Sequence, residues 1–330
     1  MGQRFVFGFT DTLLAEVGGV PLDALHFDVD AMLRAADSVI PIAEQLGATP
    51  PIPHIAGFGY PHVVALGAQA TFPPDSEPAI APIIHSIEDI DNLREPDDYL
   101  AAPLIQTRLA LSTELTARRP DAYNGIGHAL EGPVTTAVLL MGSDFLMLPY
   151  DDPKRAHKLL DFCTTSAMNY GRIITERLGG KLGPGQFTFP DDFAGMFAPD
   201  MFREFVSPYW DRLYTEYRET TRRGVHSELL RIEHLPILEE LGIGFFDPGA
   251  DHFLNPWLLR KHCHCPFQTR IQAWELRDLS PDELEALYRR TCEASPELIV
   301  FTLDRLANLP KIERLLKVAW ELAGEGEGRA

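Results

Sequence analysis

Short apolar runs alternate with longer amphipathic stretches along most of the chain, which is typical of repeated β-strand and α-helix units. In the helix expected over Asp30–Leu46, apolar residues recur at helical spacing. The second half is more regular, and its expected strands are Gln186–Phe189, Gly224–Ser227, Gly244–Asp247, Thr269–Trp274 and Leu298–Leu303. Short loops and intervening helices separate these strands. This repetition predicts an α/β fold, a (β/α)8 TIM barrel in which parallel strands close on themselves.

The first half carries weaker signals. A short strand is expected over Asn124–Leu130, and Gly132-Pro133 then opens a helix. Further helices are expected over Pro103–Arg118, Val134–Met141, Pro153–Leu178 and Ala198–Arg222, the last with a break near Pro208. An open doubly wound sheet is the alternative, but no Gly-x-Gly-x-x-Gly follows the first strand, which disfavours a dinucleotide-binding fold.

The length of 330 residues fits one barrel, because α/β barrels exceed the size at which most single cores stop growing. We therefore treat 1–330 as one domain, with 1–100 forming an N-terminal extension and the first units. The acidic tail 324–330 is expected to fray. No apolar run approaches about 18 residues, so no transmembrane helix is expected. Acidic residues near the N-terminus argue against a secretory signal, and a cytoplasmic protein is expected.

The chain is strongly acidic, with 29 Lys and Arg against 48 Asp and Glu and a formal net charge of −19. An acidic surface repels the phosphate backbone, so neither nucleic-acid nor membrane binding is expected. A polyanionic substrate would require basic residues gathered at the site. A small-molecule substrate is expected, and the sequence leaves monomer and homodimer open.

The run His262-Cys263-His264-Cys265 contains residue types that bind zinc. Neighbouring side chains point in alternating directions, so four in a row cannot close one tetrahedral site. The run also precedes the strand Thr269–Trp274, which puts it at the end of the barrel opposite the expected active site. We interpret it as a structural or surface feature, and a metal bridging a dimer contact stays open. The cysteines do not suggest a disulfide framework.

Acidic residues follow two expected strands, where barrel enzymes keep catalytic groups. Asp191 and Asp192 are candidate catalytic residues, although Asp192 could instead cap the following turn. Glu131 is a third candidate, and the alternative is a carboxylate favoured by a helix N-terminus. His128, in the strand expected just before Glu131, is a candidate for substrate binding.

His226 and Glu228 lie two residues apart on an expected strand and should share one face. On that face they could ligate a metal or act as an acid–base pair. The alternative is an ordinary solvent-facing strand end. Asp247 and Trp274 end later strands, and Tyr60 lies in a Pro- and Gly-rich loop near the rim. We expect these three to bind substrate, with turn formation and loop solvation as the alternative.

Several segments together resemble the uroporphyrinogen decarboxylase superfamily. They are Glu131–Ala137 with Met141-Gly142 and Tyr150–Pro153, Pro190–Gly195 with Pro199–Pro208, Val225–Glu228 with Glu240–Ile243, and Ile87–Leu93. The order and spacing of the segments carry the resemblance, which runs from about Phe5 to Ala319. It implies a (β/α)8-barrel enzyme.

The superfamily has two branches, and the N-terminal region separates them. The decarboxylases carry an Arg-Gln-Ala-Gly-Arg-Tyr motif that binds substrate carboxylates, whereas Phe7–Leu14 here lacks those arginines. The chain looks more like the cobalamin-dependent methyltransferases. This resemblance implies transfer of a methyl group between a small methylated substrate and a corrinoid protein or thiol. Methylcobalamin would sit on a separate corrinoid protein.

Thiol-activating members of that branch bind zinc through His-x-Cys on one strand and a Cys near the last strand. Here His226-Ser227-Glu228 keeps the first ligand and replaces the second with a carboxylate, and Asp304 is the nearest third ligand. The resemblance therefore implies zinc held by His226, Glu228 and Asp304 and acting as a Lewis acid. Alternatives are a metal-independent decarboxylase or lyase acting on a non-porphyrinogen substrate, or a non-catalytic ligand-binding barrel.

Overall fold

The computed structural model describes residues 2–127 and 130–324, and its centre is a set of parallel strands. In the described part of the chain these strands are β1 (Phe5–Phe9), β4 (Gly185–Pro190), β5 (Thr220–His226), β6 (Ile243–Asp247), β7 (Gln268–Arg270) and β8 (Leu298–Leu303). They form two sheets, ordered β4-β5-β6 and β7-β8-β1, and a parallel bridge between Phe246 and Phe267 joins the sheets. The first strand therefore pairs with the last, with Phe7 opposite Phe301. An α/β fold with parallel strands is confirmed.

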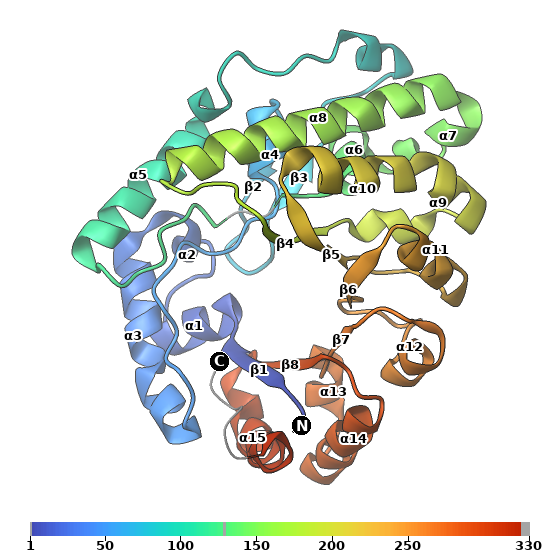
Figure 1. Ribbon diagram of the computed structural model, residues 1–330. Helices are drawn as coiled ribbons and strands as arrows, with labels where there is room; N and C mark the ends of the chain where they lie inside the picture. The colour runs from blue at the N-terminus through green and yellow to red at the C-terminus, as the bar shows by residue number, and fades with distance from the viewer. Residues whose placement is uncertain (1, 128–129, 325–330) are drawn as a thin grey trace.

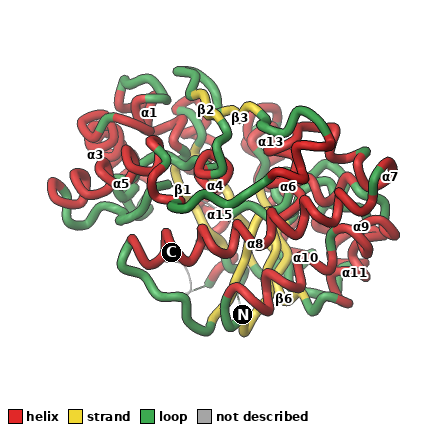
Figure 2. The backbone as a smooth tube through the Cα atoms, turned by 90° about the horizontal axis from the view of Figure 1, so that it is seen from above, coloured by secondary structure: helices red, strands yellow, loops and turns green. Residues whose placement is uncertain are grey.

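Helices surround these strands on the outside (Figure 1). Their bounds are α1 (Asp11–Gly18), α2 (Ala24–Phe27), α3 (Val29–Leu46), α4 (Pro61–Ala65), α5 (Pro103–Arg118), α6 (Pro133–Met141), α7 (Leu148–Asp151), α8 (Pro153–Arg177), α9 (Pro199–Phe205), α10 (Ser207–Arg212), α11 (Leu235–Glu240), α12 (Pro256–His262), α13 (Ala273–Asp278), α14 (Pro281–Glu293) and α15 (Leu309–Ala323). Seen from above, the strands gather between the helical layers (Figure 2). None of the described helices combines the length and apolar character that a bilayer crossing requires.

The segment between β1 and β4 has little regular strand structure. Its strands β2 (Gln69–Thr71) and β3 (Ala79–Ala81) form an antiparallel hairpin. Elsewhere, extended segments meet through separate backbone hydrogen bonds, from Phe58 N to Gly127 O at 2.8 Å and from Tyr123 N to Pro53 O at 2.9 Å. The strand expected over Asn124–Leu130 is not formed in residues 124–127 or 130. The neighbouring segment contains prolines at 50, 51 and 53, and these lack the N–H groups that a continuous ladder between the two segments would need.

In the second half, the predicted end of one helix and the predicted end of one strand are wrong. The helix expected over Ala198–Arg222 breaks near Pro208, as predicted, but it ends in a π-turn at Leu213–Tyr217, and β5 begins earlier than expected. The strand expected over Thr269–Trp274 stops at Arg270. There a capping box between Gln272 and Glu275 starts α13, so the helix start overrides the strand preference of Trp274.

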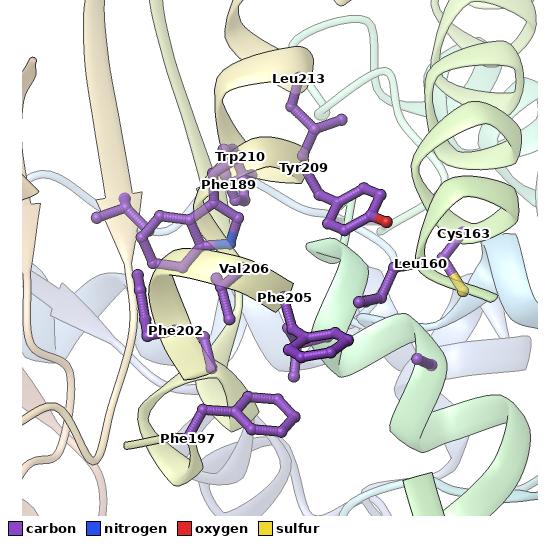
Figure 3. Packing of buried hydrophobic residues seen from close by; sticks show 14 of the residues in the cluster. Leu160, Cys163, Phe189, Phe197, Phe202, Phe205, Val206, Tyr209, Trp210 and Leu213 are labelled. Atoms are coloured by element: carbon purple, nitrogen blue, oxygen red, sulfur yellow. The ribbon is translucent and has the colours of Figure 1, made fainter. Parts of the chain in front are cut away.

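The largest buried cluster packs α8, α9 and α10 against β4 (Figure 3). Trp210 is fully buried at its centre, with its ring centroid 5.7 Å from that of Phe189 and 5.1 Å from that of Phe202. Burying aromatic side chains of this size contributes roughly 1.5–3 kcal/mol each. The same indole donates a hydrogen bond to Asp191, so this cluster also fixes the strand end at which acidic residues gather. The assignment of 1–330 to a single domain stays a prediction.

Candidate active site

The register of the β4-β5-β6 sheet brings four predicted site residues together, His226, Asp247, Asp191 and Asp192. Pro190 at the end of β4 lies opposite His226 at the end of β5, and His226 lies opposite Asp247 at the end of β6. Asp191 and Asp192 follow Pro190 directly. Because parallel strands end at the same edge, these side chains occupy one side of the molecule, where barrel enzymes carry their catalytic groups.

His226 lies between two carboxylates. Its Nδ1 is 2.8 Å from Asp247 Oδ2, and its Nε2 is 3.3 Å from Asp192 Oδ1. Only the Nδ1 contact has hydrogen-bond geometry, but a carboxylate beside each nitrogen favours the doubly protonated ring. Burial alone would lower the pKa of His226, but the two carboxylates outweigh it and raise the pKa to about 10. The site therefore contains an imidazolium at neutral pH.

Asp247 is the buried anchor of this arrangement. Its carboxylate accepts hydrogen bonds from His226, from Gly249 N at 2.9 Å and from Arg270 Nη2 at 2.5 Å. Burial alone would raise the pKa of Asp247. The hydrogen bond and charge of His226, together with Arg270, hold the pKa well below its usual range. Asp247 thus orients the imidazolium, and its predicted contact with substrate stays a prediction.

We expect the free energy of unfolding to fall as the pH rises from about 6.5 toward 10. The pKa of His226 is about 10 in the folded chain and about 6.5 unfolded, so the folded state binds more protons across this window. The contribution is complete below pH 6.5 and is lost as the pH rises through the folded value. Urea titrations at several pH values would give the free energy of unfolding as a function of pH. Across this window it should fall more steeply for wild type than for His226→Gln, by up to about 1.4 kcal/mol per pH unit. Parallel profiles for the two proteins would contradict the doubly paired imidazolium.

The carboxyl group of Glu131, near His226, is a second group whose pKa is shifted strongly. Its side chain is only 7% exposed. Burial raises the pKa of Glu131 well above its ordinary value, the charges of Asp192 and Asp191 raise it further, and His226 opposes them. A Cβ added to Gly59 would lie 2.6 Å from Glu131 Oε1, so the carboxyl touches the backbone of the opposite segment. The arrangement keeps a carboxylic acid protonated beside a cation, which suits general acid catalysis.

Asp191 holds a structural position at the end of β4, and its predicted catalytic role stays a prediction. It is fully buried and accepts hydrogen bonds from Thr135 N at 2.7 Å, Val134 N at 3.3 Å and Trp210 Nε1 at 2.7 Å. Burial raises its pKa to about 6, and the donors from Trp210 and Thr135 limit the rise. Asp191 therefore ties the start of α6 to the end of β4 and to the aromatic cluster.

Asp192 and Tyr60 complete the group around Glu131 and His226. The Asp192 side chain is 39% exposed, and its other face is open toward solvent. Burial raises the pKa of Tyr60, and the nearby charges of Glu131, Asp192 and Glu77 add to the rise. Tyr60 thus lies near the acidic group, and its predicted contact with substrate stays a prediction.

Of the other predicted residues, Glu228 lies beside His226, because a Cβ added to Gly249 would lie 2.5 Å from Glu228 Oε1 and 2.7 Å from His226 Cε1. Trp274 lies on α13, where its ring stacks on His252 with the centroids 4.4 Å apart, beside a smaller cavity of about 200 Å³. Glu228 Oε1 accepts a hydrogen bond from Ala250 N at 2.7 Å, and Asp304 Oδ1 accepts one from Asn308 Nδ2 at 2.7 Å near the start of α15. His128 lies outside the described residues.

The predicted zinc ligands do not fit a zinc ion as they are arranged. Both ring nitrogens of His226 face carboxylates, Glu228 beside it accepts from Ala250 N, and Asp304 accepts from Asn308 Nδ2 near the start of α15. Across the described residues, no three His, Cys, Asp or Glu side chains gather in a way that could hold a metal ion. Arg270 beside Asp247 adds a positive charge that disfavours a second cation. We derive no chemical step through zinc.

The sequence interpretation missed two elements of the site. Arg270 ends β7, a position hidden because that strand was expected to continue to Trp274. A cavity of about 830 Å³ lies at the end of β1 and is lined by Phe9, Asp11, His54 and Gly59, among others. Asp11 Oδ1 and His54 Nε2 are 2.8 Å apart, and this pair ties the end of β1 to the proline-rich segment. Position directly after a strand was the one signal that could have identified Asp11.

The comparison with known proteins agrees with this architecture. A family model for uroporphyrinogen decarboxylase (URO-D) matches residues 61–251, more than half of the chain. The chain belongs to the uroporphyrinogen decarboxylase family, which confirms the resemblance. A solved structure of a methyltransferase from Methanosarcina mazei is similar with a TM-score of 0.70 and 16% identity, over 98% of this chain and 94% of that chain. At that identity the likeness concerns the fold. A search of curated proteins finds no significant match.

Proposed function

We propose that this chain transfers a methyl group from a small methylated substrate to an acceptor, either the corrinoid of a separate protein or a thiol. Membership of the family and the fold shared with a methyltransferase support this reaction class. The observation that carries the proposal is the buried Glu131 carboxyl with its raised pKa, next to an imidazolium and to the wall of a large cavity. Gly59 lines that cavity and touches Glu131.

Loss of a methyl group from a neutral ether, thioether or amine leaves an anionic heteroatom that needs a proton, and Glu131 is suited to supply it. The bond between the methyl carbon and the heteroatom breaks, and its electron pair stays on the heteroatom. The acceptor bonds to the methyl carbon with its own electron pair. Glu131 donates its proton to the heteroatom and becomes a carboxylate, which the His226 imidazolium stabilises. Asp192 holds the imidazolium in place, and solvent later returns a proton to Glu131.

The cavity favours a neutral or cationic methyl donor. Its lining is mainly apolar, with Asp11 and Glu77 as acids, and the described residues that line it include no Lys or Arg. Nearby, Arg270 is paired with Asp247. A substrate with many carboxylates would find no free cation there, and the net charge of −19 adds repulsion. The lyase alternative with an anionic substrate is therefore disfavoured.

We also propose that the parallel strands close into the predicted (β/α)8 barrel. The extended segments near Phe58 and Gly127 would take the places of the second and third strands. Hydrogen bonds between these segments, and from Gly132 N to Pro190 O at 2.6 Å, support this closure. The cavity would then open at the mouth of the barrel, within a few residues of Glu131.

The test is an in vitro methyl-transfer assay with chemically reduced free cobalamin as acceptor. Methyl ethers, thioethers and methylated amines are supplied in turn, and methylcobalamin formation is followed by absorbance. A matched reaction with a thiol acceptor covers the second route, and carbon dioxide release is measured in parallel. Methylation that persists after dialysis against a chelator supports the proposal without zinc. Activity that returns only with added zinc restores the metal prediction, and carbon dioxide release without methyl transfer overturns the proposal in favour of a lyase.

A further inference from the structure

Two cysteines lie together at the turn between α12 and β7, away from the acidic group. Cys263 directly follows α12, and Cys265 lies two residues further on. Their Sγ atoms are 3.3 Å apart. His264 points elsewhere, with its side chain 75% exposed and its Nε2 3.7 Å from Glu239 Oε1. The alternation expected for this run therefore separates the thiols from the imidazole.

We propose that Cys263 and Cys265 form a thiol–disulfide exchange site that accepts oxidising equivalents from small disulfides such as glutathione disulfide. A disulfide bond is about 2.05 Å long, so the two sulfur atoms need only a short approach to bond. The pair lies in a turn, where a small backbone adjustment disturbs no helix or strand interior. This inference does not depend on the proposed methyl transfer.

The surroundings give the two thiols different roles. Cys263 is half-buried and Cys265 is buried, so Cys263 is the sulfur that an external disulfide reaches. A hydrogen bond from the Cys265 thiol lowers the pKa of Cys263, whereas the same contact raises the pKa of Cys265. A thiolate is the reactive form in exchange, so Cys263 attacks first.

The exchange balances in two steps. The Cys263 thiolate attacks one sulfur of glutathione disulfide, which gives a mixed disulfide and releases one glutathione thiolate. Cys265 then loses its proton to solvent and attacks the Cys263 sulfur, which releases the second glutathione. The two cysteines lose two electrons and two protons, and glutathione disulfide is reduced to two glutathione molecules.

The other two cysteines provide internal controls. Cys163 is fully buried within α8, and burial raises its pKa well above the ordinary value. Burial also raises the pKa of Cys292, to about 11. Both are therefore expected to stay reduced under conditions that oxidise the pair.

The test uses the full chain, equilibrated in buffers with increasing ratios of glutathione disulfide to glutathione. Free thiols are then alkylated and the protein is digested with trypsin, which releases residues 262–270 as one peptide containing both cysteines. We expect this peptide to escape alkylation and to be lighter by two hydrogen atoms than its fully reduced form, while Cys163 and Cys292 become alkylated. Cys265→Ser should retain one glutathione on Cys263, and Cys263→Ser should react about tenfold or more slowly.

Two results would overturn the proposal. One is alkylation of both thiols of the 262–270 peptide even in the most oxidising buffer, and the other is a separate glutathione on each cysteine. Equal rates for the two single variants would overturn the assignment of Cys263 as the attacking thiol. Because the readout is the mass of a peptide, failure of methyl transfer would leave this test unaffected.

Discussion

Replacing Glu131 with glutamine will lower the rate of methyl transfer by about 10²- to 10⁴-fold, the usual contribution of a positioned general acid. Glutamine has the same shape but cannot give up a proton to the heteroatom. Folding stability should hold, because a neutral amide replaces a carboxyl group that its raised pKa already keeps neutral. Steady-state rates and urea unfolding, measured on the same preparations, separate the two effects.

The pH profile provides the sharper readout for Glu131. Wild-type activity should fall on the alkaline side as Glu131 loses its proton, above the ordinary range for a glutamate. The residual activity of Glu131→Gln should lack that fall. Glu88→Gln, at an exposed position on another surface, is the matched control and should keep both rate and profile. A Glu131→Gln protein within a few-fold of the wild-type rate would remove Glu131 from the mechanism.

Replacing Asp191 with alanine will lower the free energy of unfolding by roughly 3 kcal/mol or more. The change leaves three buried donors, Thr135 N, Val134 N and Trp210 Nε1, without their acceptor, and each unpaired buried group costs about 1–3 kcal/mol. Asparagine should not restore the lost stability. The nitrogen of its amide group carries two N–H bonds, and these would point at buried N–H groups that also need an acceptor. Urea titration is the measurement.

The matched control for Asp191 is Asp97→Ala, at an exposed position, where a change within about 0.5 kcal/mol is expected. A loss below about 1 kcal/mol at Asp191 would mean that water replaces the carboxylate, and the anchoring role would be wrong. The Asp191 result also bears on the site, because Asp191 precedes Asp192 and accepts a hydrogen bond at its backbone oxygen from Ser227 Oγ at 2.8 Å.

Local signals predicted the helices better than the strands. The helix expected over Asp30–Leu46 is observed over Val29–Leu46, where Asp28 caps its start and Gly47 ends it in a left-handed conformation. Strand pairing depends instead on partners far along the chain. The chain joins β1 to β8 across almost its whole length, and no local pattern shows that contact.

Candidate residues at strand ends were found, but their partners were not. Glu131, Asp192 and His226 were recognised because they follow apolar runs, and the sheet register then groups them. Glu228 was expected to share the face of His226, and both side chains border Gly249 although β5 ends at His226 and the chain then changes direction. The positive φ of 64° at Leu229 marks that change of direction.

The uneven pairing around the strands has a consequence for how ligands reach the cavity. On one side of the molecule, continuous ladders of backbone hydrogen bonds join the strands of the β4-β5-β6 and β7-β8-β1 sheets. On the other side, the extended segments are held by separate hydrogen bonds at Phe58 and Tyr123. Local opening requires the least free energy where backbone bonds are few. The cavity next to Glu131 lies on that loosely bonded side, so its walls there can adapt to ligands of different shape at less cost in free energy than the strands that carry His226 and Asp247.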